Sequence, residues 1–78
     1  MILRRTAEKA VERWGNRGAF SFRVENITYV IDPSQTLFVI QHDLSIRYGK
    51  VLNVFIGFGV LTISTTTGSL GFEVDDPS

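Results

Sequence analysis

The spacing of the apolar residues changes once along the chain, and this change restricts the possible folds more than any other feature. Up to Trp14, apolar side chains recur at the spacing of an amphipathic helix. The helical stripe comprises Leu3, Ala7, Ala10, Val11 and Trp14. From Phe20 onward, apolar and polar residues alternate, which is typical of strands with one buried face. The sequence therefore predicts an α+β fold in which one N-terminal helix is followed only by strands.

Glycines mark the boundary between these two parts. Gly15 and Gly18 follow the helical stripe, and glycine readily adopts the left-handed conformation that ends many helices. We therefore expect a helix in residues 1–16 and a β-rich part in residues 19–74. Turn signals, of which Asp32-Pro33-Ser34 is the clearest, divide the β-rich part into about six or seven strands. We expect these strands to form a curved, mostly antiparallel sheet against which the helix packs.

The chain length of 78 residues allows a single domain, with residues 75–78 as a frayed acidic tail. Domains of this size often depend on a disulfide or a structural metal, but the sequence contains no cysteine and one histidine. We therefore expect no metal site and no cofactor, and self-association remains as a source of extra stability. No apolar run approaches the roughly 20 residues of a membrane-spanning helix, and charged residues occupy the N-terminus where a signal peptide is apolar. These features predict a cytoplasmic protein.

Residue types with catalytic chemistry are few and scattered. His42 and Asp43 are neighbours, but neighbours on a strand point to opposite faces, and no cysteine is available as a nucleophile. Gly57-Phe58-Gly59 matches only the first half of a dinucleotide-binding fingerprint and precedes a strand pattern where that fingerprint requires a helix. We therefore expect that the protein is not an enzyme.

Apolar residues occupy both alternating positions in residues 51–63. A single strand with this pattern is apolar on both faces, and the N-terminal helix can cover only one of them. The glycines on either side of Phe58 indicate a bulge or a sharp bend where two strands meet. An exposed apolar patch usually marks an interface, and the alternative is that this segment belongs to the core. The predicted interface residues are Val54, Phe55, Ile56 and Phe58.

These features favour a non-enzymatic protein–protein interaction module, such as a small adaptor, an inhibitor or an assembly subunit. We expect it to form a homo-oligomer, most simply a dimer, with the four apolar residues at or beside the contact. The residues do not identify any other protein partner.

The helix also carries a basic stripe, although the net charge of the chain is zero. The stripe consists of Arg5, Lys9 and Arg13, beyond the two glutamates of the helix. Such a stripe can neutralise phosphates of nucleic acid or of lipid headgroups. A solvated helix face explains it more simply, and the neutral chain lacks the strong positive charge of most nucleic-acid binders. A weak nucleic-acid binder is therefore the least favoured function.

The stretch from Gly49 to Thr65, preceded by Asp43-Leu-Ser-Ile46, resembles the second half of bacterial pleckstrin-homology-like domains. In that family an aspartate–hydrophobic pair precedes an apolar loop and a Gly-x-Gly strand, which Gly57-Phe58-Gly59 matches here. The threonine-bearing strand motif that lies upstream in the family is not evident in this sequence. The resemblance implies a β-barrel-like adaptor, often membrane-associated or oligomeric, with no catalytic residues. A peripheral adaptor at a membrane surface is therefore the alternative function.

Overall fold

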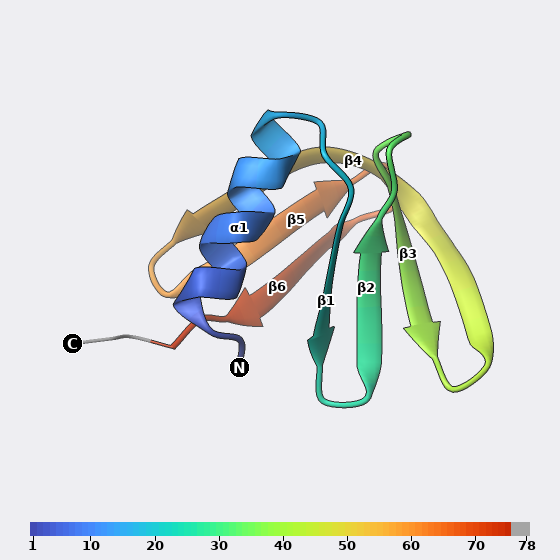
Figure 1. The fold of residues 1–78 in the computed structure, drawn as a ribbon, viewed down its shortest axis with the longest axis horizontal. Coiled ribbons are helices and arrows are strands. Elements are labelled where there is room, and N and C mark those ends of the chain that lie inside the picture. Colours follow the sequence, from blue (N-terminus) through green and yellow to red (C-terminus); the bar gives the residue numbers. More distant parts are fainter. Residues whose placement is uncertain (76–78) are drawn as a thin grey trace.

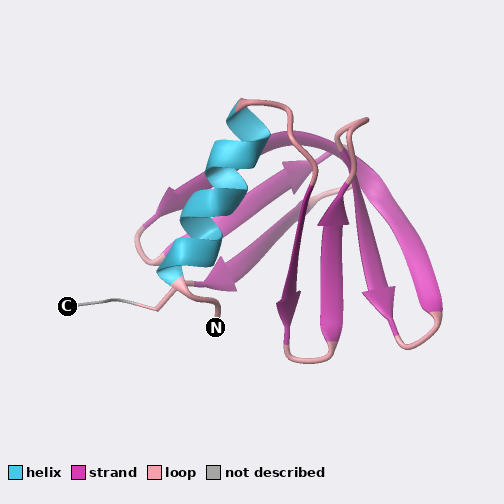
Figure 2. Ribbon diagram, in the orientation of Figure 1, coloured by secondary structure: helices cyan, strands magenta, loops and turns pink. Residues whose placement is uncertain are grey.

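The computed structural model describes residues 1–75, which form one helix and a six-stranded sheet (Figure 1). The elements are α1 (Arg4–Gly15), β1 (Phe20–Val24), β2 (Ile27–Ile31), β3 (Thr36–Gln41), β4 (Leu44–Gly57), β5 (Val60–Thr65) and β6 (Ser69–Glu73). The strands follow in space their order in the chain, and each pairs antiparallel with the next. Figure 2 shows that the sheet curls around one side of the helix. The predicted α+β architecture is confirmed.

The core lies between α1 and the concave face of the sheet. The helix contributes Ala7 and Ala10, which are buried and small enough to let the helix approach the strands closely. The largest fully buried side chains come from the sheet and are Leu37, Leu61 and Ile63. Three aromatic rings, from β1, β2 and β6, complete the core and are Phe22, Tyr29 and Phe72.

These aromatic rings connect the first strand with the last. The centroid of the Phe72 ring lies 5.2 Å from that of Phe22 and 4.7 Å from that of Tyr29, both in edge-to-face arrangements. Such pairs are favourable because the positive edge of one ring meets the negative face of the other. The strands β1 and β6 therefore share one core, although the sheet leaves them unpaired with each other.

Strand β4 is the longest element and carries the chain from one half of the curled sheet to the other (Figure 1). Its first half pairs with β3, and its second half pairs with β5. The pairing register shifts once in each half of β4. One shift lies opposite Leu37 and Phe38 of β3, and the other lies between Val51 and Asn53, where β4 pairs with β5. Such irregularities bend a strand and increase its twist, which explains the curl of the sheet.

The segment 51–63 differs from one of our expectations. It contains the end of β4 and the start of β5, joined by a tight turn at Phe58 and Gly59. The expected sharp bend is therefore present. Val54 of β4 lies opposite Ile63 of β5, and both side chains are buried. The expectation of one strand is wrong, because the turn divides the segment between β4 and β5 and changes which alternate positions face the core. Strand β4 nevertheless carries apolar side chains on both faces, since Val54 is buried whereas Leu52 and Phe55 are exposed.

The two ends of the described chain are held together. Ile2 pairs with Val74 as a parallel bridge, with hydrogen bonds from the Ile2 N–H to the Glu73 carbonyl (2.8 Å) and from the Asp75 N–H to the Ile2 carbonyl (2.9 Å). The carboxylate of Asp75 also accepts a hydrogen bond from the backbone N–H of Arg4, in the first turn of α1. It thereby satisfies a helix N–H that lacks an intrahelical partner, as a capping side chain does. The rest of the expected tail, residues 76–78, lies outside the described residues.

The helix ends at Gly15, as the sequence predicts, but the residue that adopts the left-handed conformation after it is not a glycine. Gly15 is the last helical residue, and the residue with a left-handed backbone is Arg17, with φ of 62°. The guanidinium of Arg17 lies 5.5 Å from the centre of the Trp14 ring, a cation–π contact that helps to hold this conformation.

Asp32, in the turn between β2 and β3, predicts a pH dependence of stability. Its carboxylate accepts hydrogen bonds from the Ser34 hydroxyl (2.6 Å) and from the Thr36 N–H (3.0 Å), and these bonds lower the pKa of Asp32 below its usual value of about 4. A lowered folded-state pKa stabilises the fold above the unfolded-state pKa, and this stabilisation is lost as the pH falls through the folded-state pKa.

We therefore expect the unfolding free energy of the wild type to fall as the pH is lowered from about 5 to about 2. Urea unfolding followed by circular dichroism across this range measures the effect. The variant Asp32→Asn should lose less stability over the same range, because its side chain has no carboxylate to protonate. Parallel pH profiles of the two proteins would contradict this assignment.

Candidate functional site

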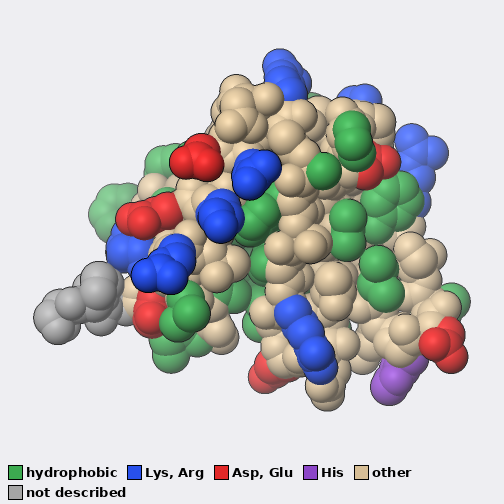
Figure 3. Space-filling view, in the orientation of Figure 1, with side chains coloured by type: hydrophobic (Ala, Val, Ile, Leu, Met, Phe, Trp, Pro, Cys, Tyr) green, Lys and Arg blue, Asp and Glu red, His purple; other side chains and the backbone are tan. Residues whose placement is uncertain are grey.

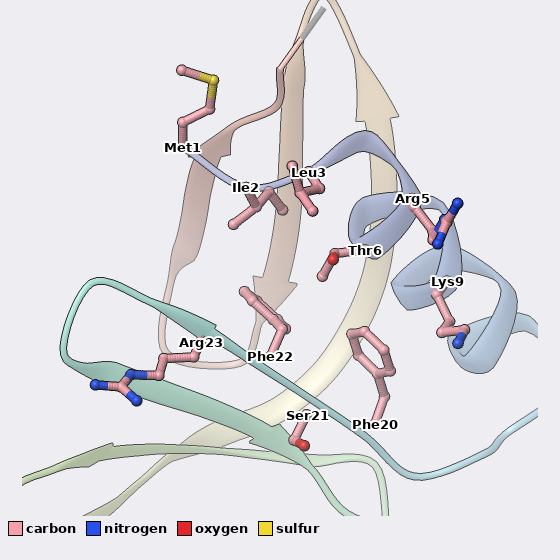
Figure 4. A pocket seen from close by; sticks show the side chains of 10 residues that line it. All are labelled: Met1, Ile2, Leu3, Arg5, Thr6, Lys9, Phe20, Ser21, Phe22 and Arg23. Atoms are coloured by element: carbon pink, nitrogen blue, oxygen red, sulfur yellow. The ribbon is translucent and has the colours of Figure 1, made fainter. Parts of the chain in front are cut away.

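A groove of about 400 Å³ opens between the N-terminal half of α1 and strand β1 (Figure 4). The segment Met1–Leu3 and the first turns of α1 form one side, and residues 20–23 of β1 form the other. Figure 4 shows the Phe20 and Phe22 rings projecting from β1 into the groove, towards Ile2 and Thr6. The side chains of Ser21 and Arg23 leave the strand on its other face. These rings form the apolar part of the groove, whose lining also includes polar and charged side chains.

One edge of β1 faces this groove without a strand partner. As the first strand of the sheet, β1 pairs only with β2, and a two-residue loop joins them so that Val24 lies opposite Ile27. In such a hairpin the closing pair is hydrogen-bonded, and every second residue of the strand directs its N–H and C=O away from the partner. On β1 these residues are Ser21 and Arg23, and both line the groove.

The opposite edge of the sheet, on β6, is covered at one end. There the N-terminal segment lies beside the end of the strand, where Ile2 forms its bridge with Val74. Natural proteins usually cover or shorten free edges, because an open row of N–H and C=O groups attracts other strands. The edge of β1 is therefore the more open of the two.

The rim of the groove is basic. Arg5 and Lys9 reach it from α1, and Arg23 lies beside it on β1, with its guanidinium directed to the other face, where its Nε–H donates a hydrogen bond to the Glu25 carbonyl (2.9 Å); all three are exposed. The described residues that line the groove include no aspartate or glutamate. Figure 3 shows Lys and Arg side chains gathered along the exposed side of α1. These basic side chains make the groove favour negatively charged groups, whereas the N-terminus of α1 is already capped by the carboxylate of Asp75.

The structure divides the predicted basic stripe. Arg5 and Lys9 lie at the groove, one helical turn apart on the same face of α1. Arg13 does not line the groove, and its side chain lies instead beside Gly18.

The four predicted interface residues also separate into two pairs. Val54 is buried in the core, and Ile56 packs against it. Phe55 is half-exposed on the opposite face of β4, where its ring covers Gly57 so closely that a Cβ on that glycine would lie 2.6 Å from the ring. Phe58 is fully exposed.

Phe58 has an unusual conformation for an aromatic residue. Phe58 and Gly59 both have positive φ, 56° and 74°, which defines a type I′ hairpin turn. The first position of this turn favours asparagine or glycine, because a left-handed backbone costs a bulky residue about 1 to 2 kcal/mol. The protein therefore keeps an apolar ring in solvent at a position where a polar residue would be more stable.

Two further exposed apolar residues lie on the first half of β4. Leu44 and Ile46 are 68% and 56% exposed, although Ile46 pairs with Val39 on the face of the sheet that carries the core. Their alternation with polar residues predicts a buried face. The sequence does not reveal that α1 is too short to cover this part of the sheet.

The open edge of β1 was also missed from the sequence. Its functional groups are backbone groups, which carry no residue-type signal. One signal was available: in a sheet whose strands pair in chain order, the first strand after the helix is an edge strand.

The remaining chemistry of the chain is limited. His42 lies exposed in the turn between β3 and β4. Residues 1–75 contain no group of three or more His, Cys, Asp or Glu side chains that could hold a metal ion. Over the same residues, no helix is long and apolar enough to cross a bilayer.

The chain matches no known protein family, no curated protein and no solved structure. The resemblance to pleckstrin-homology-like domains and the expectations that follow from it therefore stay predictions.

Proposed function

We propose that this protein is a non-enzymatic binding module that holds an extended segment of another protein along the open edge of β1. A segment in this position adds a seventh strand to the sheet, a known mode of peptide recognition. The observation that carries the proposal is that Ser21 and Arg23, whose backbone N–H and C=O groups point away from β2, line a groove that also contains the rings of Phe20 and Phe22.

The groove offers two kinds of contact. Two residues of β1 provide four backbone groups, and each hydrogen bond contributes about 1 kcal/mol net. An apolar side chain placed against Phe20, which is only partly buried, contributes roughly 1.5 to 3 kcal/mol if it is fully buried. Association itself costs several kcal/mol in lost freedom of motion. A segment of four to six residues therefore fits micromolar binding more readily than nanomolar binding.

Proline at position 21 tests the proposal. The variant Ser21→Pro removes the edge N–H, and the pairing of β1 with β2 remains because this N–H points away from β2. We expect peptides selected on the wild-type protein from a random decapeptide display library to bind this variant at least about tenfold more weakly, a loss of about 1.4 kcal/mol. Isothermal titration calorimetry measures the affinities. Hydrogen exchange should show that bound peptide protects the Ser21 and Arg23 amides of the wild type.

The matched control is Ser21→Ala, which removes the hydroxyl group and keeps the backbone N–H. This variant should bind the selected peptides like the wild type. Equal binding to Ser21→Pro, or a selection that yields no binding peptide, would contradict the proposed function. The exchange measurement needs no variant, so protection confined to other strands would also contradict it.

A further inference from the structure

We infer that the segment bound at this groove is acidic, with apolar residues at alternate positions. This inference rests on the proposed function and specifies the chemistry of the partner. It follows from the direction of the side chains on β1 and from the charges on the rim.

The apolar positions follow from the register. An added strand lies about 4.8 Å from β1, and its side chains alternate between the two faces of the sheet. A residue opposite Phe22 points to the same face as Phe22, towards the apolar part of the groove (Figure 4). Residues opposite Ser21 and Arg23 point to the other face. Every second residue of the segment should therefore be apolar.

The acidic positions follow from the basic rim. A residue directly opposite Arg23 has its Cβ about 4.5 to 5.5 Å from the Cβ of that arginine, close enough for a carboxylate to pair with the guanidinium. Arg5 and Lys9 supply two further positive charges from α1, on the groove side of the strand, where they attract the segment through its net charge and not by pairing with these residues. Glu8 and Glu12, the acidic residues of the helix, are absent from the groove lining. A basic segment would meet like charges on both sides.

The same charges disfavour a second copy of this chain as the occupant. Antiparallel pairing of two β1 edges would bring Arg23 of both copies into one interface, and Arg5 and Lys9 of both copies beside it. Like charges gathered in one interface weaken the association of two copies. The groove therefore fits an acidic segment of a different protein better than it fits itself.

Two decapeptide display pools test this inference on the intact protein. Both pools place Val, Ile, Leu, Phe or Tyr at alternate positions; one pool has Asp or Glu between them, and the other has Lys or Arg. We expect enrichment from the acidic pool only. Equal or better enrichment from the basic pool would overturn the acidic specificity and leave the proposed function intact. Failure of both pools would overturn the proposed function as well.

Two charge-reversal variants test whether the attraction of the acidic peptide comes from the groove or from the net charge of the protein. Lys9→Glu should weaken binding of an enriched acidic peptide about fivefold at low salt, because a favourable rim charge becomes a repulsive one. Arg13→Glu makes the same charge change one turn further along α1, away from the groove, and should weaken binding less than about twofold. Raising the salt concentration should reduce the difference between the two variants. Equal effects of the two reversals would show that net charge, and not the groove, attracts the peptide.

Discussion

Leu61→Ala is expected to lower the free energy of unfolding by about 2 to 5 kcal/mol, the range observed for leucine truncation in protein cores. Leu61 is fully buried on β5, where it pairs with Ile56 of β4 and with Phe72 of β6. Truncation leaves a cavity between three strands that also hold one another in register. Because a domain of this length has a total stability of roughly 4 to 12 kcal/mol, the variant should be largely unfolded at urea concentrations that the wild type tolerates.

Urea unfolding monitored by circular dichroism measures this loss, with Leu52→Ala as the matched control. Leu52 is 59% exposed on the neighbouring strand β4, and its truncation should change stability by less than about 0.5 kcal/mol. Similar losses in the two variants would mean that the concave face of the sheet is not the core.

Gly49→Ala is the second substitution with a large expected effect, about 2 to 4 kcal/mol of destabilisation. Gly49 lies where β4 changes its pairing partner, with φ of +157°, a conformation that residues with a Cβ rarely adopt. A Cβ at this position would lie 2.7 Å from the hydroxyl oxygen of Thr67 and 3.0 Å from that of Thr66. These hydroxyl groups cannot move freely, because Thr67 donates a hydrogen bond to the Tyr48 carbonyl and Thr66 accepts one from the Lys50 N–H.

Gly15→Ala is the matched control for this prediction, because it makes the same chemical change without crowding. No atom lies within 4 Å of a Cβ built on Gly15, which is the last residue of α1. This variant should be stabilised by up to about 1 kcal/mol, since alanine is more favourable than glycine in a helix. Thermal unfolding of both variants tests the opposite signs. A stable Gly49→Ala protein would contradict the close packing of β4 against the turn between β5 and β6.

Local sequence patterns predict most of this fold. The stripe that ends at Trp14 identifies the helix, and alternation together with the proline turn at Asp32-Pro33 identifies the first strands. The pattern misleads at residues 51–63, because apolar residues from two strands appear as one continuous run. The glycines beside Phe58 mark the turn, but whether two or three residues form it decides which side chains face the core. Only the turn geometry, with positive φ at Phe58 and Gly59, fixes that number.

The candidate site is less predictable for a physical reason. Arg5 and Lys9 belong to the predicted basic stripe, but their relevance depends on β1, which lies across the groove from them. The groups that define the open edge are the N–H and C=O of Ser21 and Arg23, which any residue except proline provides in full. Spatial order of the strands, and not residue identity, makes these groups available.

The expected homo-oligomer stays a prediction. The buried position of Val54 removes it from any contact between folded copies, whereas Phe55 and Phe58 remain on the surface. Leu52 of β4 is exposed as well, so the hairpin keeps apolar surface that a second copy would cover in the predicted homo-oligomer.

The joining of the two chain ends has a consequence for the order of folding. Neighbouring strands are connected by short turns, so their hairpins close loops of low entropic cost and can form early. The hydrogen bond between Arg4 and Asp75 instead spans 71 positions in the sequence and closes last. Until that step, α1 is not anchored at its N-terminal end, the N-terminal segment does not yet lie beside the end of β6, and the groove beside β1 lacks one of its sides. The assembled groove therefore marks the completion of folding, because one of its sides is placed only when the two ends of the chain meet.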